Sequence, residues 1–206
     1  NESTLSTVDG WIDTGSYVLN AIVSGSIHKG IPRGRVTMLA GESMTGKSLF
    51  IQKIIANAQK AGLTAVVFDS ENAIDPIGAE RMGIDTSNVK YIPCLTIEQT
   101  RNAIFKFLSA VKEKGLEGKF FIAIDSLGNL QSELEFSRMD KESTSSDMGS
   151  KARAMKSLLQ TCTNLGAITK STIVCTNHVY DDPTALFPSL EKNMPGGKAC
   201  VYLPSV

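Results

Sequence analysis

The sequence lacks a surplus of either charge. Its 21 Lys and Arg residues balance its 21 Asp and Glu residues, so the formal net charge is zero. Proteins that bind nucleic acid through one extended basic surface usually carry a positive net charge. The balance argues against that class, unless positive charge is concentrated locally.

Cysteine patterns typical of metal sites and disulfide frameworks are missing as well. The four cysteines, Cys94, Cys162, Cys175 and Cys200, form no CxxC pair and have no Cys/His metal spacing. Each lies among apolar or small residues, which favours buried, reduced thiols over disulfides or a zinc site.

Long apolar runs are also lacking, since none approaches the roughly 18–20 residues that span a bilayer. A charged-then-apolar leader is not visible either. With 42% hydrophobic and 20% charged residues, we expect a globular domain in the cytoplasm, the host cytoplasm if a phage encodes it, with no membrane partner. Because the chain starts at Asn1 and stops in what reads as a strand, we expect a piece of a longer protein.

Apolar segments of strand and helix type alternate along the chain. We predict strands at 36–40, 64–70, 89–94, 119–126 and 171–177, and helices at 49–62, 76–83, 97–115 and 147–166. Such alternation indicates an α/β fold with a mostly parallel twisted sheet flanked by helices. We expect residues 1–35 to be a turn-rich lead-in and residues 36–206 to be the core. Residues 131–147 and 178–197 are expected to be loops, and residues 198–206 to begin a strand.

The stretch GESMTGKS at 41–48 lies between a predicted strand and a predicted helix. It matches GxxxxGK[ST], the pattern of a loop whose backbone N–H groups surround phosphates. Gly41 and Gly46 leave room for that curl, Lys47 supplies a positive charge, and the Ser48 hydroxyl is a ligand type for Mg²⁺. A chance Gly-rich turn is the alternative. We predict a nucleoside triphosphate site.

Two acidic residues follow predicted buried strands. Asp125 ends FFIAID and would support Mg²⁺, although a strand-end Asp can also cap a turn. Ser126 rather than Glu comes next, so the base that activates water must come from elsewhere. Glu71 in FDSEN lies just past another strand, and parallel strand ends converge on ligands. It is our candidate base, and a solvated loop acid is the alternative.

Taken together, these motifs resemble the RecA-type recombinases, from about residue 19 to residue 203. The segment AVVFDSENAIDPIGAERMGID at 65–85 resembles the family segment in which a Glu two residues after an Asp is the catalytic base. IDSLGNL (124–130), DMGSKARAMKSLL (147–159) and TNHVYDD (176–182) are most similar to UvsX, the recombinase of T4-type phages.

The resemblance implies ATP and Mg²⁺ as cofactors. Glu71, Lys47 and His178 would be catalytic, with His178 at the position where most family members have a Gln that senses the γ-phosphate. Ser48 and Asp125 would hold the metal. The expected nucleotide contacts are Gly41, Glu42, Ser43, Met44, Thr45, Gly46, Lys47, Ser48, Leu49 and Asp75. Gly78 replaces a Tyr that stacks on adenine in the family, so another residue would have to supply the stack.

The family grips single-stranded DNA with two loops, which correspond to about 131–148 and 179–196. The first carries five acidic residues against two basic ones, so we expect the basic residues after it to contribute more. The candidate DNA contacts are Lys151, Arg153, Lys156, Lys192, Gly196, Gly197 and Lys198. A solvated helix face is the alternative for the lysines.

The resemblance implies a DNA-dependent ATPase that forms filaments on single-stranded DNA and exchanges strands with double-stranded DNA in recombination, repair and replication. A recombination mediator and a single-strand-binding protein are expected partners. The chain by itself is expected to be monomeric and poorly active. Two alternatives stay open: a hexameric helicase motor with the same core, and a regulatory ATP-binding paralogue.

Overall fold

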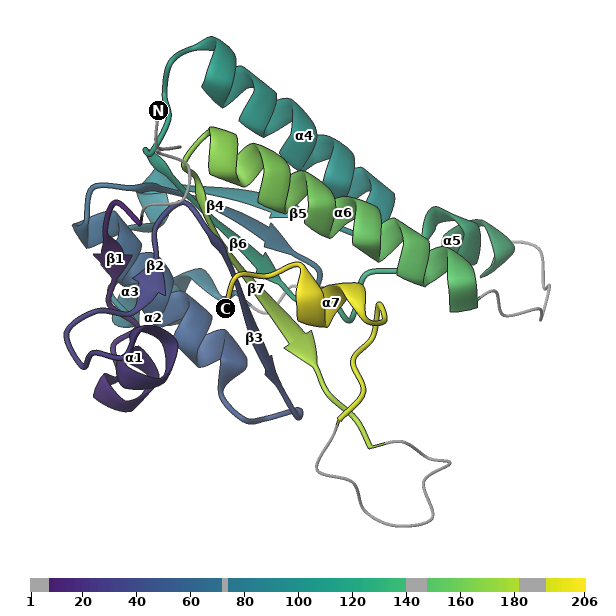
Figure 1. The fold of residues 1–206 in the computed structure, drawn as a ribbon, viewed down its shortest axis with the longest axis horizontal. Coiled ribbons are helices and arrows are strands. Elements are labelled where there is room, and N and C mark those ends of the chain that lie inside the picture. Colours follow the sequence, from purple (N-terminus) through teal and green to yellow (C-terminus); the bar gives the residue numbers. More distant parts are fainter. Residues whose placement is uncertain (1–7, 72–73, 140–147, 182–191) are drawn as a thin grey trace.

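The computed structural model describes residues 8–71, 74–139, 148–181 and 192–206 (Figure 1). At its centre lies a parallel five-stranded sheet with the order β3-β7-β6-β4-β5. The strands are β3 (Val36–Gly41), β4 (Thr64–Asp69), β5 (Val89–Pro93), β6 (Phe120–Asp125) and β7 (Thr172–His178). Strand β6 lies in the middle, which explains why FFIAID is the most apolar strand sequence.

Helices cover both faces of the sheet (Figure 1). On one face α2 (Lys47–Lys60) packs Ile51, Ile54 and Ile55 against alternate residues of the strands, and α3 (Pro76–Arg81) lies beside it. On the other face α4 (Ile97–Glu113) and α6 (Met148–Ile168) pack side by side over the remaining strand residues. The α/β fold with a parallel sheet and flanking helices is therefore confirmed.

Local signals place several helix ends. Thr96 accepts a hydrogen bond from the Gln99 N–H at 3.2 Å and so begins α4. Asp75 caps α3 in the same way, with Pro76 at the first helical position, where a missing N–H has no intrahelical partner to lose. The strand and helix predictions between residues 36 and 178 agree with these elements to within a few residues.

Three segments differ from the predictions. The lead-in forms β1 (Trp11–Ile12), α1 (Tyr17–Ser24) and β2 (Ile31–Pro32), because Ser16 caps α1 and Gly25 ends it with a φ of 71°. Residues expected to be loop form α5 (Glu133–Met139), which Ser132 begins by accepting a hydrogen bond from the Glu135 N–H. The expected strand start at 198–206 instead contains α7 (Ala199–Tyr202), which packs on α6. Parts of the two expected loops, residues 140–147 and 182–191, lie outside the described residues.

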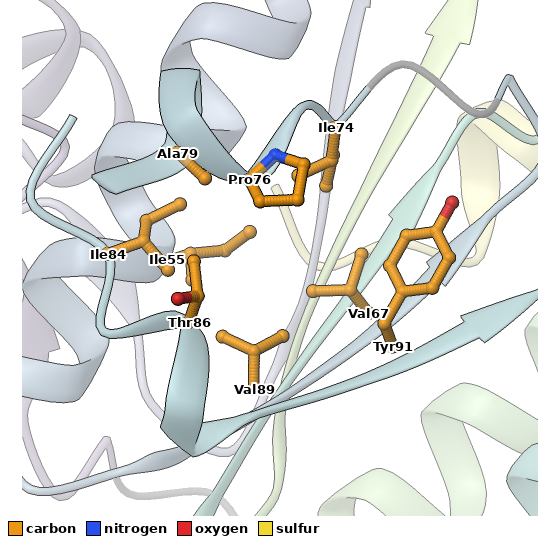
Figure 2. A pocket seen from close by; sticks show the side chains of 9 residues that line it. All are labelled: Ile55, Val67, Ile74, Pro76, Ala79, Ile84, Thr86, Val89 and Tyr91. Carbon is orange, nitrogen blue, oxygen red and sulfur yellow. The ribbon is translucent and has the colours of Figure 1, made fainter. Parts of the chain in front are cut away.

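An apolar pocket of about 340 Å³ opens between α3 and the edge of the sheet (Figure 2). Its lining comes from α2, α3, β4, β5 and the short 3₁₀ turn η2 (Thr86–Asn88). The lining residues are Ile55, Val67, Ile74, Pro76, Ala79, Ile84, Thr86, Val89 and Tyr91.

The cysteine prediction is confirmed, since all four side chains are buried and none forms a disulfide. Burial raises the pKa of the Cys162 thiol to about 12 and that of the Cys200 thiol to about 11. Across the described ranges, no group of three or more His, Cys, Asp or Glu side chains could hold a metal ion. Among the same residues, no helix has the length and apolar character to span a membrane.

Candidate nucleotide-binding site

The predicted phosphate loop connects the end of β3 to the start of α2. Gly46 has a φ of 89°, a left-handed conformation that L side chains rarely adopt. At Gly41 a Cβ would lie 2.9 Å from the Thr45 hydroxyl, which itself donates to the Glu42 carbonyl at 2.8 Å. Both glycines of the motif are therefore required by the loop's own conformation.

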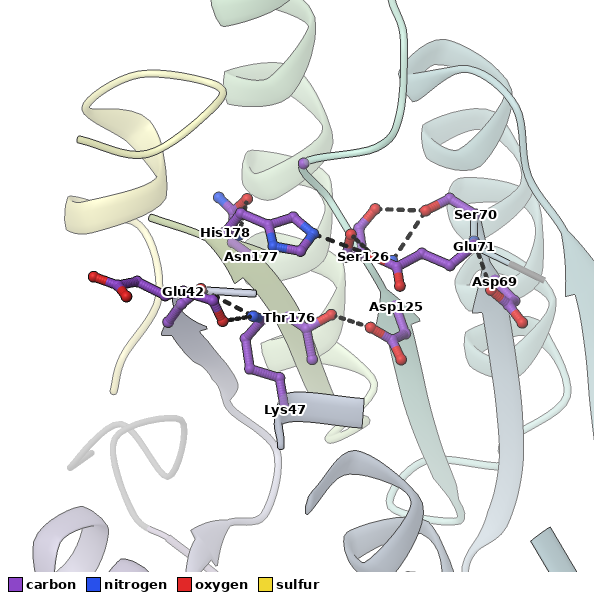
Figure 3. A network of polar contacts seen from close by, with 12 residues as sticks. Glu42, Lys47, Asp69, Ser70, Glu71, Asp125, Ser126, Thr176, Asn177 and His178 are labelled. Atoms are coloured by element: carbon purple, nitrogen blue, oxygen red, sulfur yellow. Dashed lines mark hydrogen bonds and ion pairs between the residues drawn. The ribbon is translucent and has the colours of Figure 1, made fainter. Parts of the chain in front are cut away.

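Lys47 bends back over this loop (Figure 3). Its Nζ donates to the carbonyl oxygens of Gly41 at 2.9 Å and Glu42 at 2.6 Å. The ammonium is thus held at the mouth of the loop by neutral acceptors, and an anionic oxygen would bind it more strongly. Lys47 is in place to contact an anion at the start of α2, where the helix dipole also favours negative charge.

A cleft of about 460 Å³ lies above the loop. Its walls come from the loop and from the C-terminal ends of β4, β6 and β7, where ligands bind in open parallel sheets. The residues that line it are Ser43, Met44, Gly46, Lys47, Ser48, Leu49, Glu71, Asp125 and His178. Sequence reasoning predicted every one of these residues for the site.

Asp125 is the buried acid of the cleft, with 2% of its surface exposed. Its Oδ1 accepts a hydrogen bond from the Thr176 hydroxyl. Burial raises the pKa of Asp125; the Thr176 and Ser48 hydroxyls oppose this rise, and the nearby Glu71 and Asp69 carboxylates add to it.

The second oxygen of Asp125 fits a metal-supporting role. Asp125 Oδ2 is buried and has no hydrogen-bond partner among the residues that the structure describes. The Ser48 hydroxyl lies close enough to lower the Asp125 pKa, although it does not reach hydrogen-bond geometry with Oδ2. A free carboxylate oxygen beside a hydroxyl is a donor set that suits hydrated Mg²⁺.

Glu71 points into the same cleft (Figure 3). Its Oε1 accepts a hydrogen bond from the Ser126 hydroxyl at 2.7 Å and lies 3.3 Å from His178 Nε2. Its backbone N–H donates to Asp69 Oδ1 at 2.8 Å. The structure therefore places Glu71, Asp125 and His178 together beside Lys47.

Sequence reasoning missed Ser126, which was noted only because it is not a Glu. Ser126 and Ser70 link the ends of β6 and β4, since Ser70 Oγ donates to the Ser126 carbonyl at 2.7 Å and accepts from the Ser126 N–H at 3.0 Å. The signal was a hydroxyl after each strand-end Asp, in FDS and in IDS.

Asp75 does not line the cleft. Its Oδ2 accepts a hydrogen bond from the Gly78 N–H at 2.8 Å as the cap of α3. A Cβ at Gly78 would lie 3.3 Å from that same oxygen. The cap therefore explains both residues locally, and the predicted contact of Asp75 with adenine stays a prediction.

Most of the candidate DNA contacts lie on α6 or just before α7, and these two helices pack against each other (Figure 1). Lys151 donates to the Gly128 carbonyl at 3.3 Å, and Arg153 donates to the Gly149 carbonyl at 3.2 Å. A Cβ at Gly196 would lie 2.6 Å from Met155 Cγ, and one at Gly197 would lie 3.6 Å from Ala152 Cβ. Lys198 precedes α7 and Lys156 lies on α6. Gly196 thus has a packing reason of its own, and Gly197 has a backbone reason, since its φ is 73°.

Lys192 is paired with two acidic residues. Its Nζ lies 3.2 Å from Glu42 Oε1 in the phosphate loop and also donates to Asp181 Oδ1 at 2.5 Å. These two carboxylates raise the pKa of the Lys192 ammonium, with the Asp181 hydrogen bond as the larger cause. A DNA phosphate would have to compete with both for this lysine.

Comparison with known proteins shows which family the chain resembles. The chain is 34% identical over 198 residues to Protein RecA of Chlorobium chlorochromatii. The aligned region covers 95% of this chain and 52% of that protein. It is 29% identical over 195 residues to Protein RecA of Symbiobacterium thermophilum, an alignment that covers 95% of this chain and 52% of that protein. It is 32% identical over 191 residues to Protein RecA of Rhodopirellula baltica, an alignment that covers 93% of this chain and 48% of that protein. The chain spans about half the length of these curated relatives.

These three relatives are bacterial proteins, so the finer resemblance to the phage UvsX recombinases stays a prediction. Residues 2–206 match the family described as the RecA N-terminal domain. This match extends over nearly the whole chain, and the order of its strands and the cleft at their ends are consistent with it. The chain therefore belongs to the RecA N-terminal domain family.

Proposed function

We propose that the full-length protein is a DNA-dependent ATPase that forms a helical filament on single-stranded DNA. The filament would pair that strand with double-stranded DNA and promote strand exchange in recombination, repair and replication. The supporting observation is that Lys47, Asp125 and Glu71 line one cleft. ATP binding alone needs no carboxylate that can accept a proton from water, so Glu71 favours hydrolysis.

Each residue of the cleft has a chemical role in this proposal. The backbone of residues 41–48 and the Lys47 ammonium would hold the phosphates, while Ser48 and Asp125 would hold Mg²⁺. When bound, Mg²⁺ neutralises charge on the phosphate oxygens. Glu71 would accept the proton of the attacking water. His178 Nε2, 3.3 Å from Glu71 Oε1, can donate either to that carboxylate or to a phosphate oxygen.

DNA binding would rest on the basic residues at the start of α6 and before α7. Because the chain carries no net charge, each subunit would contribute few phosphate contacts, and affinity would accumulate along the filament. Such binding is independent of base sequence and weakens steeply with salt. A recombination mediator and a single-strand-binding protein remain proposed partners, and UvsX remains the proposed subfamily.

The test uses the full-length protein with Mg²⁺, ATP and single-stranded DNA. We expect the DNA to stimulate ATP hydrolysis at least several-fold and light scattering to rise as filaments assemble. Lys47→Ala should weaken nucleotide binding and abolish both signals, because it removes the charge at the mouth of the loop. If neither the hydrolysis rate nor the light scattering changes when single-stranded DNA is added, the proposal is contradicted.

The same preparation separates the two alternatives. Closed rings in electron micrographs, with unwinding of a forked duplex, would identify a helicase motor. Tight ATP binding with no turnover would identify a regulatory paralogue. Open helical filaments and joint molecules with homologous duplex would support the recombinase.

A further inference from the structure

A chain of hydrogen bonds links the edge of the sheet to Glu71. The Tyr91 hydroxyl on edge strand β5 donates to Asp69 Oδ2 at 2.8 Å. The other oxygen, Asp69 Oδ1, accepts from the Glu71 N–H at 2.8 Å. Asp69 is 1% exposed and lies at the end of β4. One buried carboxylate thus joins a tyrosine of the edge strand to the backbone of the candidate base (Figure 3 shows its bond to Glu71).

The end of β4 is fixed on both sides, and Glu71 lies two residues beyond it. The Ser70 N–H donates to the Asp125 carbonyl at 2.9 Å, and the Asp69 carbonyl accepts from the Cys94 N–H at 2.8 Å. The backbone of Glu71 itself is held by the Asp69 carboxylate. The Asp69 carboxylate is therefore one of the contacts that set the direction in which the Glu71 side chain starts.

Tyr91 is well suited to hold Asp69 in that orientation. The pKa of Tyr91 is raised to about 12, mainly by burial and to a smaller extent by the hydrogen bond to Asp69. The hydroxyl therefore stays protonated, and able to donate, throughout the neutral pH range. Tyr91 is 42% exposed, and its ring lines the apolar pocket beside α3 (Figure 2). Thr86 contributes another hydroxyl to the same pocket, and this hydroxyl donates to Glu80.

We propose that Asp69 and Tyr91 are positioning residues for hydrolysis: the tyrosine hydroxyl orients the aspartate, and the aspartate holds the backbone of Glu71. This inference rests on the proposed ATPase function. Misplacing a reacting group by about 1 Å can lower a rate roughly 10²-fold. Removing either the Tyr91 hydroxyl or the Asp69 carboxylate should therefore reduce the turnover of ATP. The conformation of the phosphate loop and the affinity for nucleotide should stay unchanged.

The experiment measures steady-state ATP hydrolysis by the full-length protein with saturating single-stranded DNA, together with the Kd of a fluorescent ATP analogue. Tyr91→Phe keeps the ring and removes only the hydroxyl, and Thr86→Val is its matched control in the same pocket. We expect Tyr91→Phe to lower kcat roughly 10-fold, with KM and Kd within about 2-fold of wild type. Thr86→Val should leave all three unchanged.

A double-mutant cycle with Asp69→Asn tests whether the two residues act as one unit. The Asp69→Asn/Tyr91→Phe pair should lose no more kcat than the stronger single variant, whereas independent roles would multiply the two losses. A wild-type kcat for Tyr91→Phe, or multiplied losses, would overturn the inference. If thermal melting shows that Tyr91→Phe is not folded, Asp69→Asn alone provides the test. A lowered kcat with an unchanged Kd for this variant supports the inference, and a wild-type kcat refutes it.

Wild type and Glu71→Gln are run alongside. If the wild type hydrolyses ATP and Glu71→Gln does not, the proposed function is supported, whichever result Tyr91→Phe gives. Absence of wild-type turnover defeats the proposed function itself, and the inference that rests on it falls too. The two failures are therefore distinguishable.

Discussion

Removing the charge of Asp125 is expected to stabilise the nucleotide-free protein. Asp125 is 2% exposed, one of its oxygens has no hydrogen-bond partner within the described residues, and the Glu71 and Asp69 carboxylates lie nearby. Burial disfavours the charged form of a carboxylate, and like charges nearby disfavour it further. Asp125→Asn keeps the shape, and its carbonyl can still accept from Thr176. Because the neutral amide removes the buried charge, we expect the free energy of unfolding to rise near neutral pH by about 1–2 kcal/mol, the usual size of a single-substitution effect.

The pH dependence follows from the raised pKa of Asp125. As pH falls through that pKa, the folded state takes up a proton that the unfolded state, with a pKa near 3.8, does not yet bind. The wild type therefore gains stability as pH falls, and the advantage of Asp125→Asn shrinks and vanishes near the unfolded pKa. The difference in the free energy of unfolding between Asp125→Asn and wild type should be largest at pH values above the folded-state pKa of Asp125.

Urea unfolding without Mg²⁺, at about pH 7.5 and about pH 5, measures this difference. With a slope of roughly 2 kcal/mol/M, the midpoint of Asp125→Asn should exceed that of wild type by roughly 0.5–1 M at the higher pH. Glu117→Gln, which changes an exposed carboxylate, is the control and should shift the midpoint little. Adding Mg²⁺ and nucleotide should stabilise wild type alone by linkage. A variant less stable than wild type at about pH 7.5 would refute the reasoning.

Other predictions follow from single positions. Gly46→Ala forces a side chain into a φ of 89°, so it should cost about 1–2 kcal/mol in urea unfolding and weaken binding of a fluorescent ATP analogue; unchanged values would contradict this. Gly128→Ala places a Cβ 3.0 Å from His178 Cδ2; it should shift that ring and lower kcat roughly 10-fold at constant nucleotide affinity, and full activity would count against a role for His178. The pKa of Asp13 is lowered by its hydrogen bonds with the Asn20 side chain and the Gly15 N–H, so its stabilisation is present above pH 3.8 and is lost as pH falls from there through the lowered pKa; in urea unfolding Asp13→Asn should cost about 0.5 kcal/mol at neutral pH, given its exposure, and progressively less as pH falls below 3.8.

The alternation of apolar segments was enough to predict a parallel sheet, and the GxxxxGK[ST] pattern predicted the strand ends at which the cleft lies. The order of the strands could not be predicted in this way, because alternation does not say which strands become neighbours. β4 lies between β5 and β6, and this order alone brings Tyr91 and Asp125 to opposite sides of Asp69. The hydrogen-bond chain to Glu71 therefore became visible only in the structure.

The short helices were missed for a different reason. Residues 133–139 are polar and resembled a loop, yet Ser132 caps them and their first turn is acidic, as a helix N-terminus favours. Residues 199–202 resembled a strand because they are apolar, but they pack on α6 with Cys200 buried, and Gly197 turns the chain into them with a φ of 73°. Tertiary packing outweighed the local pattern in that case.

The account depends most on Glu71 as the group that activates water in a cleft that Lys47 and Asp125 prepare. The direct test compares ATP affinity and single-turnover hydrolysis in Glu71→Gln, which keeps an oxygen that can accept from Ser126. The account predicts wild-type affinity and hydrolysis slowed by roughly 10²–10⁴-fold. Hydrolysis at the wild-type rate would contradict it.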